Sequence, residues 1–142
     1  MEFTYLPKTL KQLKVNYSSR RVRDKDGFRS FENFRIWYDK APKVCYYCGL
    51  TEEESQEIVS TGLLTSNRFP LNGKPSQGRG RGMWLEVDRK DPVGLYSEEN
   101  AVLCCYFCNN DKSDIFNDIE YKKFFQNRVV YLRNLLKEKT SK

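Results

Sequence analysis

Four of the five cysteines form two matched pairs, Cys45-x-x-Cys48 and Cys105-x-x-Cys108. A Cys-x-x-Cys turn presents two thiolates to one ion, and two such turns complete the closed tetrahedron of a structural zinc site. The pattern therefore predicts one Zn²⁺ per chain, which joins the two ends of a 56-residue stretch. A closed site of this type performs no chemistry itself. Thiols that are merely buried are the alternative, and Cys104 is expected to be a small core residue.

Several polar residues stand close to the second cysteine pair in the sequence, and three of them have side-chain oxygens. Asp88 and Arg89 end an apolar run, and Asn100 follows a turn-rich stretch. Asn109 comes directly after Cys108. Carboxylate and amide oxygens suit a hard divalent cation. Taken singly, each residue also has an ordinary explanation, because Asp and Asn commonly cap turns and helices and an Asp-Arg pair can be a surface ion pair.

The order of these residues resembles the motif of the HNH, or ββα-metal, endonucleases. That motif reads Asp-His, a loop, Asn-x-x-x-Leu-Cys, then Cys-His or Cys-Asn and a Lys near the start of a helix, and the resemblance covers residues 44–117. It implies that Asp88 and Asn109 hold a catalytic Mg²⁺ or Mn²⁺ and that Asn100 braces the loop. It also implies an α+β fold with a small zinc-stapled ββα-metal core, flanking helices and basic loops.

The chain contains no histidine, and Arg89 stands where the family has its general base. An arginine stays protonated, so it binds or stabilises phosphate charge but takes no proton from water. Small, rare-cutting HNH restriction endonucleases with Asp-Arg and Cys-Asn at these positions are the most similar group, and they imply a tyrosine base. Tyr47 is the first candidate, with Tyr46 and Tyr96 in reserve. An aromatic ring inside a zinc turn can also simply pack.

Positive charge gathers in two stretches of a chain whose net charge is +6. Residues 1–43 carry eleven Lys and Arg against five Asp and Glu, and residues 65–90 carry six against two. Basic surfaces gain affinity for nucleic acid through phosphate neutralisation and counterion release, although many basic surfaces are merely solvated. The predicted DNA-contacting residues are Arg20, Arg21, Arg23, Lys25, Arg68, Lys74, Arg79, Arg81 and Lys112.

The elements that must position these groups follow from capping and periodicity. Ser30 is expected to cap a helix over residues 30–40, and Thr51 opens a capping box with Glu54. Strands are predicted over residues 83–88 and 101–105, and a helix near Cys108. Residues 65–82 are rich in Gly, Pro, Asn and Ser and predict a long basic loop.

A final helix is predicted from Ile119 to about Lys139, with Asp118 as its cap. Its apolar residues recur at helical spacing, so the helix is expected to cover the core, and a dimer contact is the alternative. The stripe consists of Phe124, Phe125, Val129, Leu132, Leu135 and Leu136.

A length of 142 residues predicts one domain, with a basic DNA-contact segment over residues 1–43, the zinc-stapled core over 44–117 and the C-terminal helix over 118–142. No apolar run approaches the roughly 18 residues that a membrane helix needs, and the first residues lack the pattern of a signal peptide. We therefore expect a cytoplasmic protein with no membrane partner.

Together these features predict a divalent-metal-dependent endonuclease that hydrolyses double-stranded DNA, with restriction-like specificity, a homodimeric state and no small-molecule substrate. The first alternative is a zinc-stapled module that binds nucleic acid without cleaving it. The second is a protein-interaction zinc domain whose basic loops are only solvated.

Overall fold

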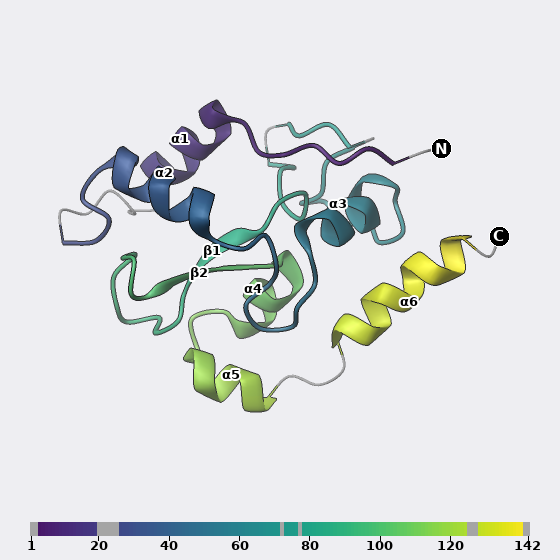
Figure 1. The fold of residues 1–142 in the computed structure, drawn as a ribbon. Helices are drawn as coiled ribbons and strands as arrows, with labels where there is room; N and C mark the ends of the chain where they lie inside the picture. Colours follow the sequence, from purple (N-terminus) through teal and green to yellow (C-terminus); the bar gives the residue numbers. More distant parts are fainter. Residues whose placement is uncertain (1–2, 20–25, 72, 77, 125–127, 141–142) are drawn as a thin grey trace.

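The computed structural model describes residues 3–19, 26–71, 73–76, 78–124 and 128–140. It is a small α+β fold in which a two-stranded sheet lies among helices (Figure 1). Within the described residues, three helices precede the sheet and three follow it. In chain order the elements are α1 Leu10–Ser19, α2 Phe31–Lys40, α3 Glu52–Ser60, β1 Glu86–Arg89, β2 Ala101–Cys104, α4 Tyr106–Lys112, α5 Asp118–Phe124 and α6 Arg128–Thr140.

The sheet is an antiparallel hairpin in which Glu86 pairs with Cys104 and Arg89 pairs with Ala101. Successive side chains of a strand point to opposite faces, so Glu86 and Asp88 share one face. Helix α4 packs against β1, and side chains of α4 contact both acidic residues. The ββα unit that the sequence predicts is therefore present.

Strand β1 begins at Glu86, three residues later than predicted from Met83. Side chains of α3 bind the backbone of the preceding residues, because Gln56 Nε2 donates to the Met83 carbonyl at 3.0 Å and Leu85 N–H donates to Glu52 Oε1 at 2.9 Å. These groups thus bond to side chains instead of to a partner strand. Met83 and Leu85 are buried, as the apolar run suggested.

Two helix starts match their sequence signals. Ser30 Oγ accepts a hydrogen bond from Asn33 N–H at 3.1 Å. Thr51 and Glu54 form the predicted capping box. Thr51 Oγ1 accepts from Glu54 N–H at 3.1 Å, and Glu54 Oε1 accepts from Thr51 N–H at 2.9 Å. These contacts are local in sequence, which explains why spacing alone predicted them.

The hydrophobic core lies between α2 and the sheet, beside the cysteine cluster. Phe34 of α2 is fully buried, and Phe28 packs edge-on against it with ring centroids 5.2 Å apart. Leu50 and Leu103 join the same cluster from the first cysteine turn and β2. The core therefore fixes the cysteine turn and the hairpin relative to each other.

The predicted single C-terminal helix is wrong, because the structure describes two shorter helices, α5 and α6, with different directions (Figure 1). Asp118 is not the cap. Asn117 Oδ1 accepts from Glu120 N–H at 2.8 Å, and Glu120 Oε1 accepts from Asn117 N–H at 3.0 Å. This reciprocal pair starts α5 one residue earlier than the Asp118 cap would.

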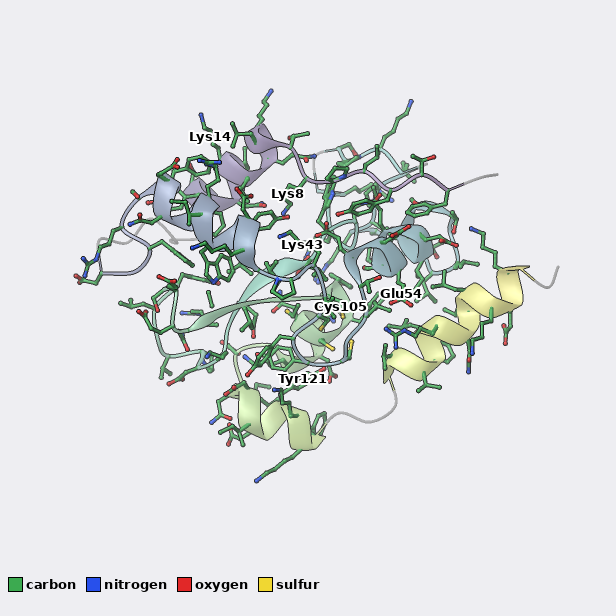
Figure 2. The ribbon with its side chains drawn as sticks, in the orientation of Figure 1. Lys8, Lys14, Lys43, Glu54, Cys105 and Tyr121 are labelled. Carbon is green, nitrogen blue, oxygen red and sulfur yellow. The ribbon has the colours of Figure 1, made fainter. Side chains whose placement is uncertain are left out.

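The predicted apolar stripe divides in the same way. Leu132 of α6 is buried in the core, whereas Phe124 at the end of α5 is 57% exposed, and Phe125 lies outside the described residues. Helix α6 packs against α3, where Arg133 binds Glu54 at 2.9 Å, and Figure 2 shows Glu54 on the side of α3 that faces α6. Helix α6 thus covers part of the core, as predicted. Among the described helices, none has the length and apolar content to cross a bilayer.

Candidate metal centre and active site

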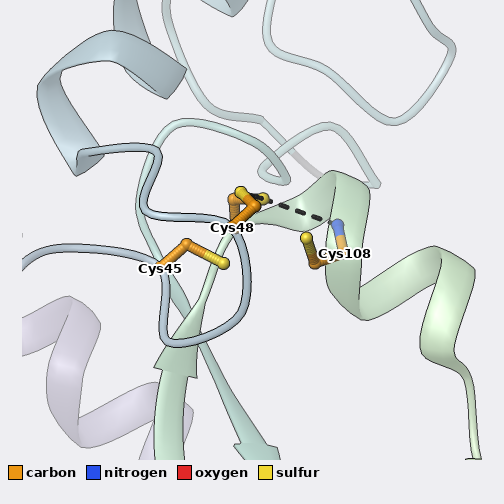
Figure 3. A group of neighbouring side chains, drawn as sticks. Cys45, Cys48 and Cys108 are labelled. Atoms are coloured by element: carbon orange, nitrogen blue, oxygen red, sulfur yellow. Dashed lines mark hydrogen bonds between the residues drawn. The ribbon is translucent and has the colours of Figure 1, made fainter. Parts of the chain in front are cut away.

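The two Cys-x-x-Cys turns come together as predicted. The Sγ atoms of Cys45, Cys48, Cys105 and Cys108 all lie within 4.8 Å of one another, and the Cys48 and Cys105 sulfur atoms are 3.8 Å apart. A tetrahedral Zn²⁺ with Zn–S bonds of about 2.3 Å requires sulfur atoms about 3.8 Å apart. Figure 3 shows the labelled cysteines converging on one point. The geometry and the ligand type both fit a zinc ion.

Each turn has a local reason to present its sulfur atoms. In the first, Gly49 adopts a positive φ of 82° and donates its N–H to the Cys45 carbonyl at 3.0 Å. In the second, Cys105 is the N-cap of α4, and its Sγ accepts from Cys108 N–H at 3.4 Å (Figure 3). Tyr46 N–H joins the first turn to β2 by donating to the Leu103 carbonyl at 2.9 Å.

The ionisation of the cluster also favours a cation. The hydrogen bond with Cys105 lowers the pKa of the Cys45 thiol, whereas the hydrogen bond with Cys108 raises the pKa of the Cys105 thiol. Three of the four cysteines are buried and Cys48 is partly exposed, and four thiolates this close cannot all carry charge unless a cation neutralises them. Cys104 does not join the cluster. It is fully buried in β2, and burial raises the pKa of its thiol, so its predicted role as a core residue is confirmed.

Asp88 lies at the centre of the second group. Asp88 is 6% exposed, and its carboxylate accepts hydrogen bonds from the Tyr47 hydroxyl and from Lys112 Nζ. Burial raises the pKa of Asp88, while Tyr47 and Lys112 act in the opposite direction. Asp88, Arg89, Tyr96 and Asn109 line one cavity of about 170 Å³. The structure thus brings together most of the predicted catalytic residues.

Lys112 was predicted to contact DNA, and that prediction is wrong for this structure because its side chain is 0% exposed. Lys112 Nζ lies 3.3 Å from Asp88 Oδ2 and donates to the Arg89 carbonyl at 2.9 Å. The residue occurs on the face of α4 that meets β1. Its ammonium group therefore offsets a buried carboxylate.

The three tyrosines considered for the base differ in their surroundings. Tyr47 is buried, and its pKa is raised by burial and then by the hydrogen bond that it donates to Asp88. Tyr46 is half-exposed and donates to Asp118 Oδ2 at 3.3 Å. The Tyr96 ring lies under the Arg89 guanidinium, 4.8 Å from its Cζ atom. Among the described contacts of these three tyrosines, it is the Tyr47 hydroxyl that donates a hydrogen bond to Asp88.

Arg89 and Asn100 both act on the loop between the strands. Arg89 Nη1 donates to the Gly94 carbonyl at 3.2 Å. Asn100 Nδ2 donates to the carbonyls of Asp91 and Leu95 at 3.1 and 3.0 Å, and its Oδ1 accepts from Asp91 N–H at 3.0 Å. A Cβ at Gly94 would come within 2.7 Å of Asn100 Nδ2. Asn100 therefore holds the loop closed around Gly94.

Glu86 was not among the predicted site residues, but it lies beside Asn109 in the structure. Asn109 Nδ2 donates to Glu86 Oε1 at 2.8 Å, and Arg81 binds the same carboxylate at 2.6 and 2.9 Å. Arg81 also stacks on the Tyr106 ring at 4.6 Å. Its side chain is 33% exposed, so the predicted contact of Arg81 with DNA stays a prediction beside this ion pair. The two-residue spacing of Glu86 and Asp88 in a strand was the signal that could have identified Glu86.

The other predicted DNA contacts are only partly visible. Arg68 and Lys74 are exposed on the basic loop, and Arg68 Nη1 donates to Asn110 Oδ1 at 3.4 Å. Arg79 is half-buried and donates to the Phe69 carbonyl at 3.3 Å. Lys14 on α1 adds another positive charge at the edge of the molecule (Figure 2). The predicted contacts Arg20, Arg21, Arg23 and Lys25 lie outside the described residues.

Comparison with known proteins gives one informative similarity. No family model and no curated protein matches the chain. The structure is similar to that of PacI, a rare-cutting HNH restriction endonuclease solved in a study of DNA perturbation. The TM-score is 0.55 at 26% sequence identity, and the match covers 80% of this chain and 73% of that chain. The two chains share a fold over most of their lengths.

Proposed function

We propose that this chain, which has an HNH-type rare-cutting restriction endonuclease fold, is a divalent-metal-dependent enzyme that cleaves double-stranded DNA at specific sequences. The observation that carries the proposal is the buried Asp88 carboxylate, which shares a cavity with Arg89 and Asn109 beside the cysteine cluster. The structural likeness supports a DNA nuclease of the HNH type. The catalytic cation, the general base, the sequence specificity and the homodimer are proposals that go beyond this likeness.

The donor set fits Mg²⁺ or Mn²⁺. Asp88 supplies a carboxylate and Asn109 an amide oxygen, and both residues line the same cavity. Hard divalent cations prefer such oxygen ligands. When bound, the cation supplies a Lewis acid that polarises the phosphoryl group and stabilises the leaving oxygen. Lys112 Nζ lies 3.3 Å from Asp88 Oδ2, so a cation must compete with this ammonium group for the carboxylate oxygens.

Arg89 is proposed to bind the scissile phosphate. Its guanidinium lines the cavity and is held in place by the Tyr96 ring and the Gly94 carbonyl. A planar guanidinium makes paired hydrogen bonds to phosphate oxygens and offsets the charge that develops on them. Because its position is fixed before DNA arrives, little side-chain freedom is lost on binding.

Tyr47 is proposed to act as the base. Its hydroxyl reaches Asp88 Oδ2 and so lies within one side chain of the cation site. Without a bound divalent cation the pKa of Tyr47 is raised, mainly by burial, and its proton stays on the phenol oxygen. Positive charge next to the phenol oxygen favours the phenolate, so the proposal requires the base to become active only in the cation-loaded protein.

The basic loop is proposed to contact phosphates or base edges through Arg68, Lys74 and Arg79, as are the N-terminal basic residues.

A homodimer on a palindromic site would place two active centres on opposite strands. A reducing compartment such as the cytoplasm would keep the four cysteines of the cluster as thiols that can bind zinc.

Incubation of the purified protein with mixed plasmid and phage DNA, with Mg²⁺, Mn²⁺ or EDTA, tests the function. We expect discrete fragments with Mg²⁺ or Mn²⁺, and none with EDTA or with the Asp88→Ala variant. A Tyr47→Phe variant that binds DNA but does not cleave would support the base assignment, and one with wild-type activity would overturn it.

A second function is a zinc-stapled module that binds nucleic acid without cleaving it. The lack of histidine and the engagement of Asp88 by Tyr47 and Lys112 favour this alternative. This alternative would be established if the protein binds DNA in a salt-sensitive way but does not cleave it with any divalent cation tested. Absence of salt-sensitive DNA binding would instead indicate a protein-interaction domain.

A further inference from the structure

Two parallel contacts join β1 to α4. Asp88 binds Lys112, and Glu86 binds Asn109, so residues two apart on the strand meet residues three apart on the helix. Strand residues at i and i+2 share a face, and helix residues at i and i+3 share a face, which makes the two contacts parts of one interface. The first contact holds a proposed cation ligand directly. The second holds the other proposed ligand, Asn109.

The contact with Glu86 decides which way the Asn109 amide faces. A carboxylate only accepts hydrogen bonds, so the amide must turn its NH₂ group toward Glu86, as the 2.8 Å contact from Nδ2 to Oε1 shows. The amide oxygen then lies on the other arm of the same planar group. In the reverse orientation, two oxygens would oppose each other at hydrogen-bonding distance.

Arg81 in turn fixes Glu86. Its Nε and Nη2 atoms donate to the two carboxylate oxygens at 2.9 and 2.6 Å, and its guanidinium rests on the Tyr106 ring. A bidentate guanidinium favours the ionised, acceptor-only form of a carboxylate and fixes its plane. Glu86 is 7% exposed, so water does not readily replace these partners.

We propose that Glu86, held by Arg81, is a positioning residue that fixes the Asn109 amide with its oxygen available to the catalytic cation. This inference rests on the proposed function, because it assumes that Asn109 is a ligand. It also gives Arg81 a role in cation binding in place of the DNA contact that the sequence suggested. Groups that orient a metal ligand typically change metal affinity by 10- to 100-fold when they are altered.

The test measures Mn²⁺ binding to the zinc-loaded full chain by electron paramagnetic resonance and by calorimetry, without DNA. We expect Glu86→Gln to weaken Mn²⁺ binding by about 10-fold or more, because a glutamine can face Asn109 with either oxygen or NH₂. Glu99→Gln, which removes an exposed carboxylate outside the described cavity, is the matched control and should bind as the wild type does.

A swapped pair separates positioning from simple structural support. In Glu86→Gln combined with Asn109→Asp, the glutamine NH₂ donates and residue 109 presents only oxygens, so Mn²⁺ affinity should return to the wild-type value or above it. If Glu86 were only structural, Glu86→Gln would lower the melting temperature with Mn²⁺ affinity unchanged, and the inference would be overturned.

Arg81→Met distinguishes the two roles of Arg81. Positioning predicts weaker Mn²⁺ binding, with a smaller loss than for Glu86→Gln because Glu86 still accepts from Asn109. If Arg81 only contacts DNA, Arg81→Met leaves Mn²⁺ binding unchanged. The salt dependence of DNA affinity then becomes shallower, by about the amount expected for one lost phosphate contact. That result would contradict the inference.

The two levels of the proposal fail differently. If the wild-type protein and the Asp88→Asn variant bind Mn²⁺ equally, or neither binds it, the proposed cation site is overturned and this inference with it. If Asp88→Asn weakens Mn²⁺ binding but Glu86→Gln does not, only this inference is overturned.

Discussion

Lys112 Nζ lies 3.3 Å from Asp88 Oδ2, and both side chains are buried between β1 and α4. Breaking a buried ion pair by removing one partner leaves an uncompensated charge, whereas replacing both partners removes the conflict. This pair therefore links the stability of the ββα unit to the carboxylate proposed to hold the cation.

The Asp88–Lys112 pair should behave as a coupled unit in unfolding. We expect Lys112→Met and Asp88→Asn each to lower the free energy of unfolding by about 3 kcal/mol. The double variant should cost much less than the sum of the two. Urea denaturation of the zinc-loaded protein measures the three values. Additive losses would show that the two residues stabilise the fold independently.

The cysteine cluster should account for one zinc ion per chain. We expect Cys48→Ser or Cys108→Ser to lose zinc and most of the cooperative unfolding transition, because binding of a structural zinc contributes directly to folding. Cys104→Ala is the matched control, since Cys104 is buried outside the cluster. It should keep zinc, as measured by atomic absorption. Full zinc content in the Cys48 and Cys108 variants would contradict the site.

The close approach of Gly94 to Asn100 should matter for activity. A Cβ at Gly94 would meet Asn100 Nδ2 at 2.7 Å and displace the carbonyl that binds Arg89. We expect Gly94→Ala to lower the cleavage rate by about 10- to 100-fold while zinc content stays unchanged. Gly80→Ala, whose added Cβ would meet nothing within 4 Å, is the control in the basic loop. Equal rates for both variants would argue against the brace.

Arg89 should require its planar guanidinium. We expect Arg89→Lys to reduce the single-turnover cleavage rate on the order of 100-fold, because a lysine neither stacks on Tyr96 nor pairs with two phosphate oxygens. Arg35→Lys on α2 serves as the control, since Arg35 bonds only to Glu32 and Asp39 among the described residues. A wild-type rate for Arg89→Lys would exclude the proposed phosphate contact.

Features encoded by short spacing were predictable. The Ser30 cap, the Thr51–Glu54 capping box and the two cysteine turns each depend on residues a few positions apart, so backbone geometry alone brings their atoms together. The helix predicted near Cys108 begins at Tyr106, because Cys105 serves as its cap.

Features that depend on distant partners were predicted less well. The apolar run from Met83 suggested strand, but Glu52 and Gln56 of α3 bind its backbone in place of a partner strand. The stripe in residues 118–142 suggested one helix, and the fold instead uses α5 and α6 separately, with α6 against α3. Periodicity reports which residues are apolar, whereas the packing partner decides where an element begins and ends.

The sequence by itself determined the four cysteines of the cluster, the order of Asp88, Asn100 and Asn109 around them, and the absence of histidine. Only the tertiary structure decided that Lys112 is a buried partner of Asp88 and that Arg81 and Glu86 hold Asn109. The physical reason is that a lysine or arginine has the same charge on a surface and in an interior. The role of such a residue depends on what packs against it. For Lys112, this is decided by which face of α4 packs against β1, a relationship between elements that residue spacing does not contain.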